Sequence, residues 1–414
     1  MQTIIKSVYH QTLFLLLALL VLLVPAQGHG HGRPGTFVRI DVATLPDNAR
    51  LQSLLDAAVR HGLPGVSLRV KGPGIDFQGS AGLANLITGE PLTTRHVMYT
   101  ASLGKTFTAA VALQLCDEGR LDLETPITSW LSADVTRRIP SSGKITLRHL
   151  LSHTSGIIDY LNDARHWRSD FVRDPQRQWT HSDVVPYLYD KPLLFEPGTD
   201  YDYSNSNYIM AGLIIEQVSG QPVHTLIRKR VLEPVGLQHT YNGNEAVSSE
   251  YRAHGYVNRH GRIIDTYPWY SHSGLADSGI HSTPGELALF IKALFNTENI
   301  LSIPMRMEMM NVSASGRPPS DYGMGIYVQC NPWGAGQRWY THDGIDPGYQ
   351  ADMMYLPDHG LAIVLTANAS QGSADVIYEK LLAAVVQYAL KNGVMKNRGQ
   401  VFHRSRINKR PSCD

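Results

Sequence analysis

The sequence predicts a mixed α/β (α+β) fold in which one antiparallel sheet, built from both ends of the chain, is flanked by helices. Two observations support this prediction. Strand-like segments occur within residues 64–84 and again within 349–367, and each pair lies beside a segment with helical periodicity. Between them, from about 98 to 275, the pattern changes to helices joined by long loops rich in Pro, Asp and Gly, which predicts an inserted all-helical lobe. We expect the functional site in the cleft between the sheet and this lobe.

The N-terminal part of the fold is expected to be a helix followed by a hairpin. Apolar residues recur at helical spacing over residues 48–62, and Gly62 supplies a stop signal. Residues 64–70 then alternate apolar and polar side chains, as a half-buried strand does. The turn sequence at 71–74 leads into a second strand over 75–84, so the two strands are expected to pair.

The C-terminal part is expected to complete the same sheet. Residues 349–356 and 361–367 read as two strands, separated by the turn sequence at 357–360. The continuous apolar run at 361–365 is typical of a central strand that is covered on both faces. Residues 373–390 have the pattern of an amphipathic helix that closes the fold.

Composition and charge exclude several classes of protein. The 414 residues are 43% hydrophobic and 18% charged, which excludes disorder, collagen and coiled coil as the dominant state. The formal net charge is +1, so charge gives no argument for nucleic-acid binding. Split by segment, the charge is +6 over residues 391–414 and +1 over residues 1–26, which leaves −6 for the body. The three cysteines, Cys116, Cys330 and Cys413, are too few for a disulfide scaffold, and which of them pair stays open.

The two ends of the chain are expected to lie outside the folded domain. Residues 1–26 read as a secretory signal peptide, with one lysine, the apolar run 13–24 and small residues at a cleavage site. As a helix that run would span roughly 18 Å, less than the bilayer core of about 30 Å, so an uncleaved membrane anchor is the lesser alternative. Residues 27–46 read as a linker, 47–392 as the domain, and 393–414 as a basic tail. We therefore expect an exported protein, periplasmic or secreted.

Ser102 and Lys105 form the first of three short motifs that carry chemistry. They stand three residues apart where a helical pattern begins, so both side chains are expected on one face of its first turn. A serine hydroxyl is a poor nucleophile until a neighbouring base takes its proton, and a lysine amine acts as that base only where its pKa is lowered. The same spacing recurs at Ser141 and Lys144, where no helix is expected, so we interpret that pair as a chance match.

The second and third motifs follow in order along the chain. Tyr203 and Asn205 stand two residues apart in a loop that precedes an apolar helix, so both side chains are expected to face the same side. His342 and Gly344 come just before the last two strands, where a glycine lets a substrate approach the backbone closely. Each motif alone occurs easily by chance, whereas all three in order, each in the element type it needs, point to a catalytic site.

Longer stretches around these motifs resemble the serine β-lactamase and penicillin-binding protein family, in its branch of class C β-lactamases, DD-peptidases and related esterases. The resemblance covers roughly residues 48–390 and implies a β-lactamase/transpeptidase-like fold. One departure is His342, where β-lactamases of this branch usually have lysine and which is more similar to DD-peptidases and D-aminopeptidases. The matching stretches are 99–108, 145–156, 195–205, 232–237 and 322–325.

The resemblance implies acyl transfer through a serine acyl-enzyme, with no metal and no organic cofactor. Ser102 would attack a carbonyl carbon, and neutral Lys105 would take its proton. Tyr203 would pass a proton to the leaving group and activate water for deacylation. Asn205 would hold Lys105 and the substrate amide in place.

The resemblance also implies how the substrate is held. The backbone N–H groups of Ser102 and of Ile345, which follows Gly344, would form an oxyanion hole. His342 would line the substrate side and bind a carboxylate when protonated. These groups complete the expected site.

We therefore expect a serine hydrolase, most similar to DD-peptidases and D-amino-acid peptidases. A β-lactamase or a carboxylesterase on the same scaffold is the alternative, and a non-catalytic penicillin-binding sensor is a remote one. The expected substrate is a small peptide, lactam or ester, including peptidoglycan-derived ones. No nucleic acid is expected as a partner, and envelope association would be at most peripheral.

Overall fold

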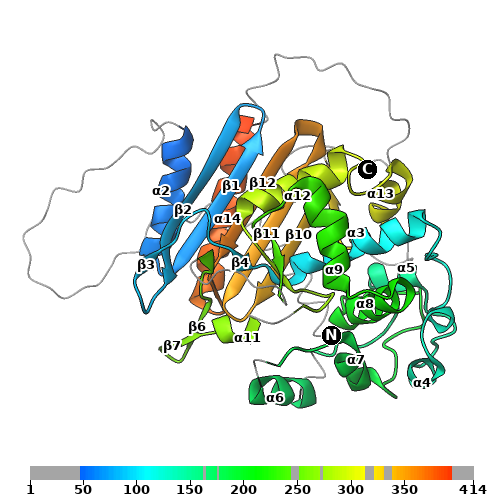
Figure 1. The fold of residues 1–414 in the computed structure, drawn as a ribbon. Helices are drawn as coiled ribbons and strands as arrows, with labels where there is room; N and C mark the ends of the chain where they lie inside the picture. The colour runs from blue at the N-terminus through cyan, green and yellow to red at the C-terminus, as the bar shows by residue number, and fades with distance from the viewer. Residues whose placement is uncertain are drawn as a thin grey trace, which may run out of the picture. The chain divides into compact units, whose positions relative to one another are not determined.

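A seven-stranded antiparallel sheet forms the centre of the computed structural model (Figure 1). In β1 and β12, Val66 lies opposite Ala367 and Lys71 opposite Ala362, so strands from the two ends of the folded chain are neighbours. The predicted sheet built from both ends is therefore confirmed. The strands run in the order β3 (Glu90–Pro91), β2 (Ile75–Asn85), β1 (Gly65–Gly72), β12 (Leu361–Ala367), β11 (Tyr349–Leu356), β10 (Arg338–Asp346) and β9 (Tyr327–Cys330).

Seven stretches of the chain are described by the structure. The predicted signal peptide and linker, residues 1–46, lie outside them, and so does the basic tail after residue 393. Cys413 and the side chain of Cys330 are likewise not described, whereas Cys116 is a free thiol. The described residues are 47–161, 165–174, 177–243, 251–270, 274–312, 321–330 and 338–393.

Helices cover both faces of the sheet. On one face α2 (Asp47–Arg60) and α14 (Ser373–Gly393) pack on β1, β2 and β12, and on the other α12 (Pro284–Asn296) packs on β1, β11 and β12. Every residue of β12 is buried because successive side chains enter alternate cores: Ile363 packs beneath α14, and Val364 packs in the larger core on the α12 face. This is the doubly covered central strand that the apolar run predicted.

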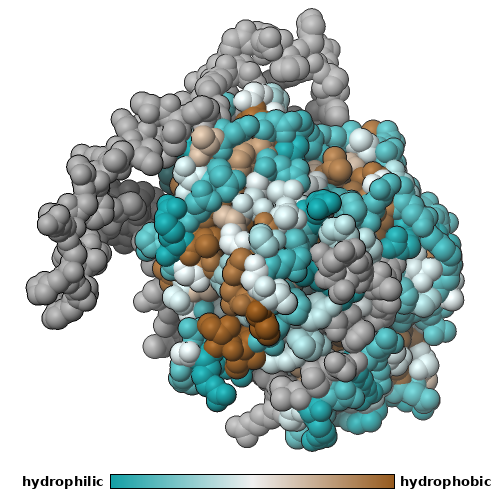
Figure 2. Space-filling view, turned by 60° about the vertical axis from the view of Figure 1, so that its left-hand side comes forward, coloured by the Kyte–Doolittle hydropathy of each residue, from teal (hydrophilic) through white to brown (hydrophobic). Residues whose placement is uncertain are grey.

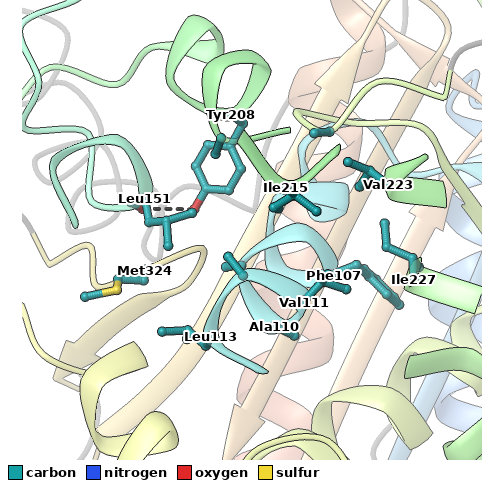
Figure 3. Close-up of a cluster of buried hydrophobic side chains, with 14 of the residues drawn as sticks. Phe107, Ala110, Val111, Leu113, Leu151, Tyr208, Ile215, Val223, Ile227 and Met324 are labelled. Atoms are coloured by element: carbon teal, nitrogen blue, oxygen red, sulfur yellow. Dashed lines mark hydrogen bonds between the residues drawn. The ribbon is translucent and has the colours of Figure 1, made fainter. Parts of the chain in front are cut away.

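The helix α3 (Gly104–Asp117) runs through the larger core and begins directly after the first motif. Figure 3 shows Phe107 and Val111 of α3 among apolar side chains from α8 (Asn205–Ser219) and α9 (Val223–Ile227). The hydroxyl of Tyr208 in α8 donates to the Leu151 carbonyl at 2.9 Å, which ties α8 to α5. Close packing of this kind leaves little freedom to shift, so the helices that carry the first two motifs are fixed relative to each other.

Further helices complete the described part of the chain. They are α4 (Ala133–Thr136), α5 (Leu147–Leu151), α6 (Arg165–Arg173), α7 (His181–Val184), α10 (Glu233–Val235), α11 (Tyr267–Tyr270) and α13 (Ile303–Met309), with 3-10 turns at Ala101–Leu103, Ile127–Ser129, Val185–Leu188 and Pro357–His359 and a π-helical turn at Arg228–Leu232.

The segment predicted to be all helical also contains short strands, so that part of the prediction is wrong. Two small sheets involve it, with the orders β13-β6-β7 and β4-β8-β5. Their strands are too short for an alternating pattern to stand out in the sequence. The strands are β4 (Met98–Tyr99), β5 (Tyr241–Asn242), β6 (Tyr256–Arg259), β7 (Arg262–Asp265), β8 (Ile280–Ser282) and β13 (Ala369–Ser370).

The surface is mostly hydrophilic on the face shown in Figure 2, with a smaller area of brown, hydrophobic residues. Large apolar side chains that remain exposed include Ile87 after β2 and Ile263 in β7. Within the stretches that the structure describes, no helix combines the length and the hydropathy needed to cross a bilayer.

Candidate active site

The candidate nucleophile, Ser102, lies in a tight turn between β4 and α3. The turn is the 3-10 helix Ala101–Leu103, and Ala101 has φ 48°, in the left-handed region that side chains other than glycine rarely adopt. Leu103 is fully buried, while Ser102 itself is partly exposed. The turn therefore holds the serine hydroxyl at the surface of a rigid core.

Lys105 is fully buried and donates three hydrogen bonds. Its Nζ lies 3.1 Å from Ser102 Oγ, 2.7 Å from Asn205 Oδ1 and 2.6 Å from the backbone carbonyl oxygen of Asp277. Two of these partners, the amide and carbonyl oxygens, can only accept. In a neutral amine they take the two N–H bonds, and the lone pair is then directed at the serine hydroxyl. This is the geometry that a general base for Ser102 needs.

Burial lowers the pKa of Lys105 below its usual 10.5. The opposing effect comes from nearby carboxyls, of which Asp277, Asp159 and Asp346 act most strongly. A lowered pKa increases the neutral fraction of the amine near physiological pH, which is the form that accepts a proton.

Tyr203 reaches the serine from the loop before α8. Its hydroxyl lies close enough to the Ser102 side chain to be influenced by it, and its ring centre lies 5.1 Å from Lys105 Nζ. Burial raises the pKa of Tyr203 well above 10.0, although the nearby Ser102 side chain lowers it in part. The phenol is therefore protonated at neutral pH, so it stands ready to donate a proton to a leaving group.

Asn205 is the first residue of α8, after Ser204 as N-cap. Its Oδ1 accepts from Lys105, and its Nδ2 donates to Asp159 Oδ2 at 3.0 Å. The expected contact with Lys105 is present in the structure. The side chain is thus oriented from both ends, which fixes the position of the amide.

His342 occupies a different environment from the one we expected. It is 1% exposed; its Nδ1 lies 2.7 Å from the Asp343 carbonyl oxygen, and its Nε2 lies 3.0 Å from the Tyr322 hydroxyl. Because the carbonyl only accepts, Nδ1 carries the proton and Nε2 accepts from Tyr322. Burial lowers the pKa of His342 to about 4. The expectation that a protonated His342 binds a carboxylate is therefore wrong for this structure.

Gly344 lies within β10 and faces the nucleophile turn. A Cβ at this position would be 2.2 Å from the Thr100 carbonyl oxygen and 3.0 Å from the Ser102 nitrogen. The glycine is thus needed for contact between strand and turn, which corrects the expectation that it makes room for substrate. The contact places the next residue, Ile345, beside the Ser102 backbone; Ile345 is 53% exposed.

Replacing Gly344 with Ala is expected to disturb the nucleophile turn. The added methyl group must displace the Thr100 carbonyl, so we expect a loss of about 1–3 kcal/mol in the free energy of unfolding and about 100-fold in kcat. Denaturant titration and steady-state kinetics measure the two effects. Gly143→Ala is the matched control, because a Cβ there meets no atom within 4 Å. Wild-type kinetics in Gly344→Ala would contradict the close contact.

Two residue pairs that have the spacing of a functional motif lie outside the catalytic arrangement or have a structural role. Ser141 and Lys144 lie in an exposed turn, where Lys144 forms an ion pair with Glu196 at 3.0 Å. His149 and His153 have the spacing of metal ligands, but Nδ1 of His149 accepts from the Thr146 N–H in a helix cap. Among the described residues, no group of three or more His, Cys, Asp and Glu side chains could hold a metal ion.

Several residues around Lys105 were missed by the sequence reasoning. Asp277 contributes a backbone carbonyl, which has no signature in a sequence. The Asp159 carboxylate is found only through its contact with Asn205. His153 packs its ring 4.2 Å from that of Tyr203 and 4.7 Å from that of Tyr322, measured between centroids. His153 lies within the matching stretch 145–156, but its position in the sequence did not distinguish a packing role from a chemical one.

A buried lysine aimed at a partly exposed serine, with a protonated phenol nearby, is the arrangement of a serine hydrolase. Comparison with known sequences agrees: the sequence model described as Beta-lactamase matches residues 49–388, and the chain belongs to this family of hydrolases. A penicillin-binding protein of Bacillus subtilis (strain 168) is 28% identical, over 82% of this chain and 75% of the relative.

Solved structures show the same fold. The D-stereospecific amidohydrolase from a Streptomyces species is 28% identical, with a TM-score of 0.69, and the match covers 82% of this chain and 98% of that one. The D-amino acid amidase from Ochrobactrum anthropi SV3 is 26% identical, with a TM-score of 0.70 and coverage of 83% and 98%. The predicted β-lactamase/transpeptidase-like fold is thereby confirmed.

Proposed function

We propose that the protein hydrolyses amides of D-amino acids that carry a free amino group, in the manner of a D-amino-acid amidase or D-aminopeptidase. The observation that carries the proposal is the charge around Lys105. The charged groups that act most strongly on this lysine are all carboxyls, namely Asp277, Asp159, Asp346 and Asp343.

The raised pKa values of two carboxyls indicate a site short of positive charge. Burial and the neighbouring Asp277 raise the pKa of Asp346 to about 7, and burial raises that of Asp159. A substrate ammonium group would supply the missing counter-charge. A substrate carboxylate would find a neutral His342 and these acids instead, which disfavours peptides that are recognised through a free C-terminus.

The proposed reaction proceeds through an acyl-enzyme. Ser102 Oγ attacks the amide carbon, its proton moves to Lys105 Nζ, and the oxyanion accepts from the backbone N–H groups of Ser102 and Ile345. The C–N bond breaks as the amine leaves with the proton of Tyr203, which the lysine ammonium replaces. Water then attacks the acyl carbon while its proton passes by way of Tyr203 to Lys105, and the lysine returns that proton to Ser102 Oγ as the ester C–O bond breaks.

The D configuration is supported by the similar structures rather than by the charges. Both solved structures described above are named for D-stereospecific or D-amino acid substrates, and each is covered almost over its full length. The geometry of an acidic site beside the nucleophile is compatible with either enantiomer, so configuration needs its own test.

The test compares D-phenylalanine amide with its N-acetyl derivative, which lacks the ammonium charge. Loss of a charge-assisted contact is expected to lower kcat/KM for the acetylated amide by about 10- to 100-fold. L-phenylalanine amide tests configuration. A peptide that is acetylated at its amines and ends in D-Ala-D-Ala tests the DD-peptidase alternative. Preference for the acetylated amide or for the D-Ala-D-Ala peptide would overturn the proposal. A chromogenic cephalosporin tests for β-lactamase activity.

A carboxylesterase is the second candidate, and a sequence similarity favours it. The esterase EstB of Burkholderia gladioli is 29% identical over 49% of this chain and 53% of the relative. Faster turnover of short p-nitrophenyl esters than of any amide in the panel would favour this activity.

We also propose that the protein is exported and acts on small substrates outside the cytoplasm. The support is the signal-like sequence of residues 1–26, with the cleavage site expected after Ala26. N-terminal sequencing of protein recovered from the periplasm or medium tests this, and an intact Met1 on cytoplasmic protein would contradict it.

A further inference from the structure

The backbone carbonyl of Asp277 is one of the two acceptors that direct the lone pair of Lys105, so its position matters for catalysis. We propose that His181 is a positioning residue for Lys105, because it holds the Ala276–Asp277 segment that carries this carbonyl. The inference uses the role of Lys105 as a base in the proposed function, but it does not depend on which substrate the enzyme takes.

A continuous path of contacts connects His181 to the lysine. The backbone N–H of Ala276 donates to His181 Nε2 at 3.0 Å, and the carbonyl of the next residue, Asp277, accepts from Lys105 at 2.6 Å. Ala276 and Asp277 are consecutive residues, so a shift of the Ala276 N–H also moves the Asp277 carbonyl. His181 is 3% exposed and begins the short helix α7.

The protonation of His181 follows from its two partners. Because a backbone N–H only donates, Nε2 must be the acceptor, and the proton lies on Nδ1. Nδ1 then donates to Glu216 Oε2 at 3.0 Å, and Glu216 Oε1 accepts from the Val223 N–H at 3.2 Å. Burial raises the pKa of Glu216, but the hydrogen bond from His181 opposes this effect and the net shift is downward, so Glu216 is a carboxylate. The carboxylate therefore fixes both the tautomer and the orientation of the imidazole.

Close packing against α8 holds the His181 imidazole in position. A Cβ on Gly212 of α8 would lie 2.5 Å from His181 Nε2 and 2.7 Å from Ala276 Cβ. On the other side of the segment, Thr108 Oγ1 in α3 donates to the Ala276 carbonyl at 2.7 Å. The segment is thus held from both sides, with its N–H fixed by His181 and its carbonyl by the helix of Lys105.

The helix α8 consequently determines both acceptors of the lysine. Its first residue, Asn205, accepts from Lys105 directly, and Glu216, three turns along, acts through His181 and Ala276. Because both acceptors, Asn205 Oδ1 and the Asp277 carbonyl oxygen, are positioned by the same rigid helix, the angle between them at Lys105 Nζ stays constant. That angle directs the lone pair of Lys105 at Ser102.

Two substitutions of similar size separate positioning from general structure. In His181→Gln the side-chain amide reaches the place of Nε2, so it can still accept from Ala276. In His181→Asn the amide reaches only the place of Nδ1, so the bond to Glu216 can remain and the bond to Ala276 is lost. The readout is the rate of covalent labelling by a fluorophosphonate, which reports the reactivity of Ser102 without reference to the natural substrate.

We expect His181→Gln to label within about threefold of wild type and His181→Asn about 100-fold more slowly, the typical effect of a small misplacement. In His181→Asn the acid limb of the labelling rate should also move to lower pH, because the ammonium form of Lys105 loses a hydrogen-bond acceptor. Thermal unfolding of both variants measures their stability.

Equal labelling rates in the two variants would overturn the proposal, whether both stay fast or both fall. A slow His181→Asn variant whose acid limb is unmoved would also overturn it, since the lysine would then be undisturbed. Failure of the amidase proposal appears separately, as a lack of D-amide hydrolysis by a wild-type protein that labels normally.

Discussion

Ser102→Ala is expected to abolish covalent labelling by a fluorophosphonate or a fluorescent penicillin and to lower kcat/KM by at least about 10⁴-fold. The reason is that the hydroxyl is the atom that becomes acylated, and neither Lys105 nor Tyr203 can replace it. The fold should persist, because Ser102 is partly exposed and its removal leaves the Ala101–Leu103 turn intact.

The chain supplies a matched control for this substitution. Ser141 begins the other Ser-x-x-Lys sequence, but it lies in a turn at the surface, so Ser141→Ala should leave labelling and hydrolysis unchanged. Labelling that survives in Ser102→Ala, or disappears in Ser141→Ala, would show that the nucleophile is assigned to the wrong serine.

The elements and residue types that were predicted correctly depend on local patterns. The strands β11 and β12 have the bounds expected from the turn between them and from the apolar run at 361–365, and α3 begins within two residues of the motif. Three-residue spacing at a helix start places Ser102 and Lys105 together whatever the rest of the chain does. The two small sheets were missed because strands of a few residues leave no periodic signal.

The parts of the site that were missed depend on long-range packing. The carbonyl of Asp277 reaches Lys105 from 172 residues away, and a carbonyl is common to every residue. The sequence shows that His342 is a histidine, but only the surrounding Tyr322 and β10 backbone determine that it is buried and neutral. For Gly344, the sequence indicates close approach without identifying the nucleophile turn as the approaching group.

Lys105→Met is expected to lower the labelling rate and kcat by about 10³-fold, within the range of 10²–10⁴ for a general base. Methionine fills much of the same space but cannot take the proton of Ser102. Two buried acceptors, on Asn205 and Asp277, lose their donor at a cost of about 1–3 kcal/mol each, and loss of a desolvated amine offsets part of it. We therefore expect a modest fall in Tm beside a large fall in rate.

The pH dependence distinguishes a lost base from a disturbed fold. In the wild type, labelling should rise with pH as the amine becomes neutral, with a midpoint below 10.5 because burial lowers the pKa of Lys105. Lys105→Met should lack this limb altogether, whereas a folding defect would lower the rate at every pH and keep the limb. Lys144→Met is the control, since its exposed ion pair with Glu196 contributes only about 0–1 kcal/mol. A Lys105→Met variant that labels within tenfold of wild type and retains the limb would place the base elsewhere, and Tyr203 would be the next group to test.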